Sequence, residues 1–314
     1  MPPEGNYLIT GGSIKVRPSP VRTPYLDSHF QALDRLYARA SPGAFHNSLE
    51  RSNDLRQESF PNINESEEAY GGLAKEIWEW IYDAETSTPI MWVHSPTGEE
   101  TSHIAQAIAD AMHQRGELTG SFFFSDISNS GRYDGTRLVP TLAYQLTQSI
   151  PQTRLDIANA VVQDRSIFDL TLLHQFCKLV VEPLERFSQS IEQEVSTAPK
   201  LFIIHALEEC HTPGFEESFI EVLGSSLGRM QHNIPQRFLI LGCHSDDLEG
   251  YLSKPLLQDI VLRRPLHHLP DSKPTSDSDE KSFLDFFHLS ENNKRALLMH
   301  GAIFAQRIVK GLLR

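Results

Sequence analysis

The chain has 314 residues, of which 39% are hydrophobic and 22% are charged, and its formal net charge is −13. This composition is typical of a folded chain with a sizeable core, and the negative charge disfavours nonspecific binding to nucleic acid or to anionic lipid. The three cysteines form no C-x-x-C pair, no apolar run approaches the roughly 20 residues that span a bilayer, and the N-terminus lacks the features of a secretory signal. We therefore expect an intracellular, cytoplasmic protein without a membrane span.

The first 66 residues indicate an irregular N-terminal arm. Residues 7–10 and 13–16 flank a Gly-Gly pair, and they form either a short hairpin or an unstructured tail. Residues 28–40 have the apolar spacing of a helix. Residues 41–66 are polar and contain few apolar side chains, so we expect an extended linker there.

The next stretch has the outline of a phosphate-binding loop. A helix is expected over residues 67–83, and the apolar residues 90–93 then lead into a loop that contains Pro and Gly. An amphipathic helix over residues 103–115 follows directly. Strand, loop and helix in this order frame a P-loop, whose consensus is G-x-x-x-x-G-K-[ST]. An ordinary strand-to-helix turn has the same outline, so the loop alone leaves both interpretations open.

The degenerate nucleotide-binding loop of this interpretation comprises Ser95, Gly98, Glu100, Thr101 and Ser102. Ser95 stands at the first Gly of the consensus, Glu100 at the second Gly and Thr101 at the Lys, whereas Ser102 keeps its type. Losing the charge-assisted hydrogen bond of the Lys costs roughly 1.5–3 kcal/mol. A carboxylate about 6 Å from a phosphate charge adds about 3 kcal/mol of repulsion at an effective dielectric constant of about 20. Together these changes weaken phosphate binding on the order of a thousandfold or more.

Further apolar segments alternate with helices along the chain. The expected strands cover residues 90–93, 121–125, 201–204, 238–241 and 260–262. The helices expected between the later strands cover residues 140–149, 152–163, 169–187 and 215–230. Short apolar strands that alternate with helices indicate a parallel sheet covered on both faces. We therefore predict an α/β fold with three layers and a P-loop NTPase-like core, an irregular N-terminal arm and a short C-terminal helical stub.

Several stretches together suggest a family. They are residues 42–48, 121–125, 131–132, 134–135, 137–138, 140–146, 201–210 and 235–240. These stretches, in this order, resemble the fungal NACHT-domain proteins of the STAND class of P-loop NTPases, and specifically their nephrocystin-like N-terminal module. The resemblance covers roughly residues 40–310 and implies four parts. These are an arm or linker over 1–66, the NACHT-like core over 67–268, a linker over 269–282 and the start of a helical lobe over 283–314.

The departures from the family fall on its functional positions. The Walker B strand of the family ends in an Asp that holds magnesium through water, but here it ends in His205, and an imidazole is a poor ligand for this hard cation. Glu208 and Glu209 match the acidic pair that follows in the family, and they are the candidate catalytic residues. Residues 242–244 are Gly-Cys-His where the family has Ser-Arg after its sensor strand. The loss of groups that serve one chemistry indicates that selection for nucleotide turnover is absent or relaxed.

The resemblance therefore implies a pseudo-NTPase that acts as a signalling or protein-interaction module, with protein partners and with self-association left open. No cofactor and no metal site are expected, and an enzymatic role is disfavoured. The alternative is a weak molecular switch that binds ATP or GTP with magnesium through Ser102, the loop N–H groups and Glu208 or Glu209. The helical lobes of the family are cut short here, which indicates a truncated paralogue or an incomplete gene model.

Two other patterns have ordinary interpretations. Residues 224–228 match the G-x-S-x-G elbow of a serine hydrolase, and Asp246 with His267 or His268 follows in the right order, but helical spacing runs straight through the motif. The 14 histidines form no zinc motif.

Arg132 and Arg137 remain as charged residues of a loop. They are expected to be either solvated or in contact with a phosphate or a partner.

Overall fold

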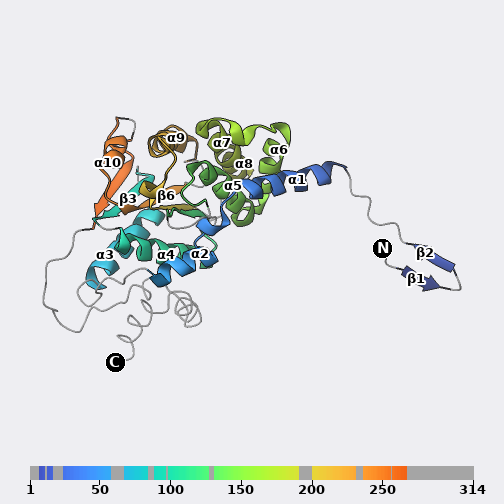
Figure 1. Ribbon diagram of the computed structural model, residues 1–314, viewed down its shortest axis with the longest axis horizontal. Coiled ribbons are helices and arrows are strands. Elements are labelled where there is room, and N and C mark those ends of the chain that lie inside the picture. Colours follow the sequence, from blue (N-terminus) through green and yellow to red (C-terminus); the bar gives the residue numbers. More distant parts are fainter. Residues whose placement is uncertain are drawn as a thin grey trace, which may run out of the picture.

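Five parallel strands form a sheet in the part of the chain that the structure describes (Figure 1). A computed structural model describes residues 7–10, 13–16, 24–57, 67–83, 88–96, 98–126, 131–190, 200–230, 236–255 and 257–266. The strands are β3 (Ile90–Ser95), β4 (Leu118–Phe123), β5 (Leu201–His205), β6 (Arg237–Cys243) and β7 (Val261–Pro265). Their order is β4-β5-β6-β3-β7, and all four pairings are parallel.

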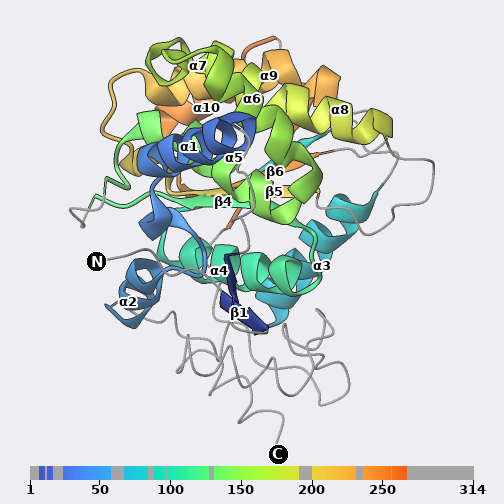
Figure 2. The ribbon, with the colours of Figure 1, turned by 90° about the vertical axis from the view of Figure 1, so that its right-hand side faces the viewer.

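Helices cover both faces of this sheet, as Figure 2 shows. One face packs on α3 (Glu67–Tyr82) and α4 (Glu99–Gln114). The other face packs on α5 (Leu138–Ser149), α6 (Arg154–Gln163), α7 (Leu172–Phe176), the π-helical segment Cys177–Val181, α8 (Glu182–Ser190), α9 (Phe215–Met230) and α10 (Asp246–Leu252), with α1 (Pro24–Arg39) outside α5 and α6. The predicted three-layer α/β fold is confirmed.

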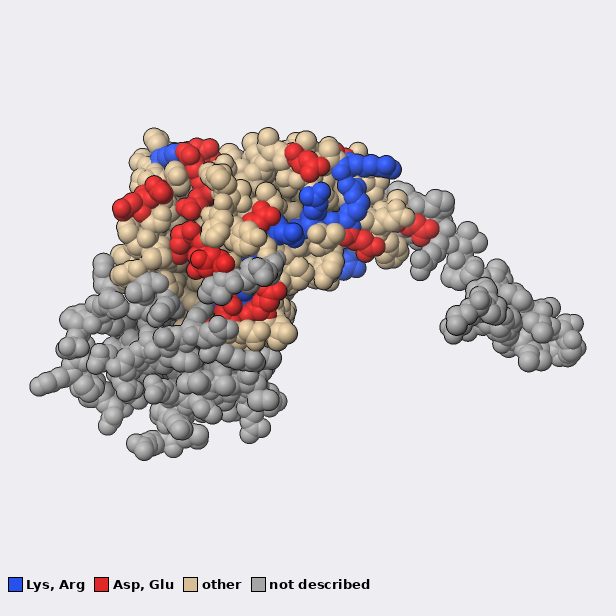
Figure 3. Space-filling view, in the orientation of Figure 1, with Lys and Arg blue, Asp and Glu red and all other residues tan. Residues whose placement is uncertain are grey.

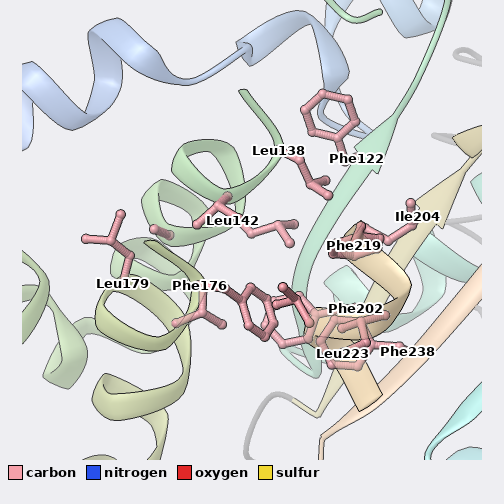
Figure 4. Packing of buried hydrophobic residues seen from close by; sticks show 14 of the residues in the cluster. Phe122, Leu138, Leu142, Phe176, Leu179, Phe202, Ile204, Phe219, Leu223 and Phe238 are labelled. Carbon is pink, nitrogen blue, oxygen red and sulfur yellow. The ribbon is translucent and has the colours of Figure 1, made fainter. Parts of the chain in front are cut away.

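Successive side chains of a strand point to opposite faces of the sheet. In β3, Ile90 and Trp92 belong to the larger cluster while Met91 and Val93 belong to the cluster under α3 and α4, and all four side chains are fully buried. Figure 4 shows the larger cluster, where the rings of Phe202 and Phe238 on neighbouring strands stack with centroids 4.7 Å apart. Burying one such ring contributes roughly 1.5–3 kcal/mol. This core holds the carboxyl ends of the strands in fixed register.

The connections place the switch point of the sheet beside the predicted loop. From β3 the chain crosses to the edge strand β4, and from β6 it crosses over β3 to β7. The helices that follow these neighbouring strands, α4 and α10, therefore lie on opposite faces. In open parallel sheets the crevice outside the carboxyl ends at such a point is where ligands bind.

The expected extended linker over 41–66 is wrong for its first part. Residues 41–57, which we call the strap, contain a 3-10 turn (Pro42–Ala44) and α2 (Leu49–Gln57), and they pass the edge of β4 to reach α4 (Figure 2). Ser48 caps α2, because its hydroxyl accepts the N–H of Arg51 at 3.0 Å. The polar composition of this segment suggested a solvated linker, but its polar groups form hydrogen bonds with the core instead of with water.

The strap bonds to several elements of the core. The N–H of Ser41 donates to the hydroxyl of Thr141 in α5 at 2.8 Å, and the N–H of His46 donates to the hydroxyl of Ser121 in β4 at 3.2 Å. The carbonyl of His46 accepts the side-chain amide of Gln106 in α4 at 2.9 Å. The strap thereby covers an edge strand that would otherwise expose unpaired backbone groups.

Other predictions have different outcomes. The hairpin is present, with β1 (Tyr7–Thr10) antiparallel to β2 (Ser13–Val16). The serine-hydrolase alternative is wrong, because α9 continues unbroken through residues 224–228. The motif therefore lies inside a helix and does not follow directly after a strand, as the elbow requires. His267, His268, the linker over 269–282 and the stub over 283–314 lie outside the described residues, and the division into domains stays a prediction. In the described residues, no helix is both long and apolar enough to span a membrane.

Candidate functional site at the carboxyl edge of the sheet

The loop between β3 and α4 bonds to itself. Gly98 has φ 77°, a left-handed conformation that favours glycine, and it stands at the N-cap of α4. Its N–H donates to the hydroxyl of Ser95 at 3.0 Å, and its carbonyl accepts the hydroxyl of Thr101 at 2.6 Å. Both hydroxyls are therefore used inside the loop.

Thr101 stands where the predicted P-loop would have its lysine, and its side chain is fully buried. It turns back to the loop, so this position supplies no cation for a phosphate. Glu100 lies in the first turn of α4, and its side chain is outside the described part of the structure. The described part of this loop thus uses its hydroxyls within the loop, and the lysine of the predicted P-loop has no counterpart in it.

Ser102, the one consensus residue that keeps its type, is bonded to an arginine of the strap. A single nitrogen of Arg51, Nη2, donates to the hydroxyl of Ser102 at 2.7 Å and to its carbonyl at 2.9 Å. Nε of Arg51 donates to Gln106 one turn further along α4 at 3.1 Å. The guanidinium is 2% exposed and lies 4.6 Å from the ring centroid of Phe123. In the P-loop consensus this serine hydroxyl would bind magnesium, but here it accepts a hydrogen bond from a cation.

His205, at the predicted Walker B position, is also unsuited to magnesium. It ends β5 in a buried position against the ring of Phe123, and neither ring nitrogen has a hydrogen-bond partner among the described residues. Burial, with Arg51 and Arg132 nearby, holds the pKa of His205 well below its usual value, so the imidazole is neutral. A neutral imidazole buried beside cations does not supply the oxygen ligands that magnesium requires.

The acidic pair after β5 splits in two directions. Ala206 has φ 55°, an uncommon conformation for a residue with a Cβ, and the chain then makes a 3-10 turn over Leu207–Glu209. The carboxylate of Glu208 accepts the N–H of Cys243 at the end of β6, and burial raises the pKa of Glu208 to about 7. The carboxylate of Glu209 instead accepts the N–H of Asp126 at 3.1 Å, and burial raises its pKa as well.

The carboxylate of Glu208 lies in the space that a side chain at residue 242 would take. A Cβ on Gly242 would lie 2.4 Å from Oε2 of Glu208, closer than atoms approach without a shift. The carboxylate therefore joins the tips of β5 and β6. In this position it serves the structure of the edge, and its hydrogen bond to Cys243 is to the backbone.

The sensor position contributes contacts to the loop but no arginine. The thiol of Cys243 lies 3.1 Å from the carbonyl of Pro96, and Gly98 packs against the same cysteine. The rings of Trp92, His94 and His244 form a stack beside it, with centroids 4.1 Å apart for the first pair and 4.9 Å for the second. The loop therefore lies on the end of β6.

The residues at this edge do not fit a magnesium–nucleotide complex. The hydroxyl of Ser102 is engaged by Arg51, residue 101 supplies no ammonium, and His205 replaces the acid. Three or more potential metal ligands gather at no place within the described ranges. The structure places Ser95, Gly98, Thr101 and Ser102 in one loop, and their role in nucleotide binding stays a prediction. The sequence did not identify Arg51 as a neighbour of this loop.

Arg132 is a second residue whose place the sequence did not show. It is 1% exposed, so the interpretation as a solvated loop residue is wrong. Its Nη2 lies 2.6 Å from the carboxylate of Asp54 in the strap, and its Nε donates to the carbonyl of Phe123 at 3.1 Å. Arg137 is partly exposed and donates to the carbonyl of Ala40 at 3.3 Å. The capping serine at 48 before a polar helical stretch was the one sequence signal that could have revealed α2.

Comparisons with known proteins give a family. Two solved structures, of Drosophila ORC bound to GC-rich DNA and Cdc6 and of the same complex on AT-rich DNA, align with TM-scores of 0.39 and 0.38 at 15% and 13% identity. Each alignment covers 84% of this chain and 36% of the other, so the chain spans about a third of the length of those proteins. No curated protein matches the chain. The model of the family described as "Nephrocystin 3, N-terminal" matches residues 73–242, which is more than half of the 314 residues. The chain therefore belongs to the nephrocystin 3 N-terminal family.

Proposed function

We propose that this protein is a pseudo-NTPase of the NACHT and STAND type that acts as a signalling or protein-interaction module. The observation that carries the proposal is the bond between Arg51 and Ser102, since it takes up the P-loop hydroxyl with a protein cation. The lost lysine and the buried His205 support the same conclusion. The resemblance to fungal NACHT proteins and the family match support the signalling role.

The surface supports a protein partner rather than nucleic acid. Figure 3 shows acidic side chains gathered over α9 and α10 and basic ones over α1 on one face, so neither sign dominates it. Phe30 and Tyr37 on α1 and Leu155 on α6 are 61%, 49% and 53% exposed, and the side chains of His29 and Asn159 join these helices at 2.8 Å. A protein contact surface needs such side chains in one contiguous patch, and these three are the candidates for it.

A weak ATP- or GTP-binding switch is the second candidate. It is favoured by the place of α4, whose N-terminus opens at the switch point between β3 and β6, where backbone N–H groups and the helix dipole attract phosphate. In this candidate Ser102 and one of the two glutamates would contact the nucleotide after Arg51 moves.

Turnover of nucleotide tests the proposal. Release of inorganic phosphate from ATP and from GTP would be measured for the wild type and for a Glu100→Gly/Thr101→Lys variant, with magnesium present. We expect no release above background from the wild type, because Arg51 engages Ser102 and the imidazole of His205 stands in place of the magnesium-holding acid. Turnover by the wild type that Ser102→Ala abolishes would refute the pseudo-NTPase assignment.

A further inference from the structure

The strap reaches the loop through one buried cation. The guanidinium of Arg51 is bonded to the hydroxyl and the carbonyl of Ser102 and to the side chain of Gln106, so it contacts two successive turns of α4. Its central carbon lies over the ring of Phe123 at the end of β4, 4.6 Å from the ring centroid. This geometry is that of a fitted internal contact, because Nε and Nη2 both have acceptors and the cation lies over an aromatic ring.

A second buried arginine, which belongs to the core, also contacts the strap. Arg132 extends from the segment after β4 to Asp54 of α2, with Nη2 2.6 Å from the carboxylate, and its Nη1 lies 4.0 Å from Glu50. Both arginines contact Phe123. The guanidinium of Arg51 lies over its ring, and Nε of Arg132 donates to its carbonyl. An arginine of the strap, Arg51, therefore bonds to the core, and an arginine of the core, Arg132, pairs with the strap.

Little apolar packing holds α2 in place. Leu55 is buried, but Leu49 is 74% exposed and most other residues of this helix are polar. A segment that polar contacts hold, with few buried apolar ones, opens locally at a lower free energy than a core helix. Two arginine contacts therefore hold α2 on the core: Arg51 joins it to α4, and Arg132 joins it to the segment after β4.

We propose that Arg51 is the resident cation of this loop, and that it latches the strap onto α4 in the place that a P-loop gives to magnesium. A guanidinium and a divalent ion do not bind one hydroxyl oxygen together, because their like charges repel at that range. A metal–nucleotide complex can then engage Ser102 only after the strap leaves. The latch extends the proposed function and rests on its claim that the loop is closed to metal–nucleotide.

Hydrogen exchange of the whole 314-residue chain, without nucleotide, tests the latch by itself. Arg51→Met removes the guanidinium and keeps an apolar stem over Phe123. We expect the backbone amides of residues 49–57 and 99–106 to exchange about ten- to a hundredfold faster, as loss of a hydrogen bond to a charged group predicts. Unchanged exchange at both segments would overturn the proposal.

Arg237→Met is the matched control. Arg237 is also 2% exposed and donates to a backbone carbonyl, that of Asp83 at 2.9 Å, but it begins β6 at the opposite edge of the sheet. We expect this variant to leave residues 49–57 as protected as in the wild type. Equal opening of the strap in both variants would overturn the latch, because it would show general loosening.

A milder variant serves if Arg51→Met does not fold. Ser102→Ala removes the hydroxyl acceptor and keeps the carbonyl acceptor, so we expect a smaller rise in exchange at the same amides.

In the Glu100→Gly/Thr101→Lys variant, ATP with magnesium should make the amides of 49–57 exchange faster. Bound nucleotide with a fully protected strap would refute the latch, whereas nucleotide binding by the wild type would refute the proposed function.

Discussion

The two edges of the sheet treat buried charge differently. At the amino edge, Glu117 directly precedes β4 and is 3% exposed. Its carboxylate accepts hydrogen bonds from the hydroxyl of Tyr82 and, at 2.9 Å, from Nε of Arg115. Nζ of Lys200 lies 3.8 Å from the same carboxylate. At the carboxyl edge, His205 has no hydrogen-bond partner among the described residues, and burial raises the pKa of Glu208 to about 7. The amino edge is a compensated structural network, whereas the carboxyl edge keeps the polar groups and backbone strain that mark functional sites.

The largest effect is expected at the amino edge. Glu117→Gln leaves Lys200 and Arg115 facing a neutral group in a mostly buried position, and Tyr82 without its charged acceptor. Removing one partner of such a network should lower the free energy of unfolding by about 3 kcal/mol. Urea denaturation measures this, and a loss below about 1 kcal/mol would show that this edge is no better compensated than the other.

Glu208 gives the next largest effect, and its sign depends on pH. Its pKa rises from 4.5 to about 7 in the fold, so its protonated form is favoured there, and the stability that it contributes is complete below pH 4.5 and is lost as pH rises through 7. Glu208→Gln should therefore be more stable than the wild type above pH 7, by up to about 3 kcal/mol, and equal to it near pH 4. Thermal unfolding across this pH range measures the difference.

The control for this prediction is Glu221→Gln, whose side chain is 55% exposed and pairs with Lys254. It should change the free energy of unfolding by less than Glu208→Gln does above pH 7, because solvent screens an exposed carboxylate. Parallel curves for the wild type and Glu208→Gln would contradict the assignment of a raised pKa to Glu208.

His205→Leu is expected to have a smaller effect of the opposite sign to Glu117→Gln. An apolar side chain of similar size removes two ring nitrogens that have no partner among the described residues. We expect a gain of about 1 kcal/mol in the free energy of unfolding, measured by urea denaturation. A clear loss of stability would show that the imidazole has a partner, such as a water molecule or a ligand.

The smallest effect belongs to an exposed pair away from both edges. Arg186 on α8 lies 2.9 Å from Asp156 on α6, and the side chains are 56% and 30% exposed. Asp156→Asn should change the free energy of unfolding by less than about 1 kcal/mol, because solvent and salt screen the pair. A larger loss in the same urea series would mean that exposure is a poor guide to the cost of removing charge in this protein.

The apolar framework could be predicted from the sequence, because its signals are local. Ile90 to Val93 alternate between two buried clusters, and the turns of α4 follow its apolar spacing. The strap could not be predicted in the same way. Its contacts join residues far apart in the chain, such as Arg51 and Ser102, which are 51 positions apart, and a polar composition does not distinguish a solvated segment from one bonded to the core.

The candidate site shows the same division. The substitutions at Thr101 and His205 were visible from the sequence, and the structure adds where the side chains turn. Glu208 and Glu209 lie in a 3-10 turn that follows the left-handed Ala206, and alanine gives no sequence signal for that conformation. The cation next to Ser102 comes from outside the motif, so no inspection of the loop alone would find it.

Calorimetric titration with ATP and ADP, with and without magnesium, tests the central claim most directly. The wild type should give no binding heat at millimolar nucleotide, and the Glu100→Gly/Thr101→Lys variant should bind, because it restores the approach of the backbone and the ammonium. That result would establish a P-loop framework without its chemistry. Micromolar binding by the wild type would contradict the account and would make the nucleotide switch the function of this protein.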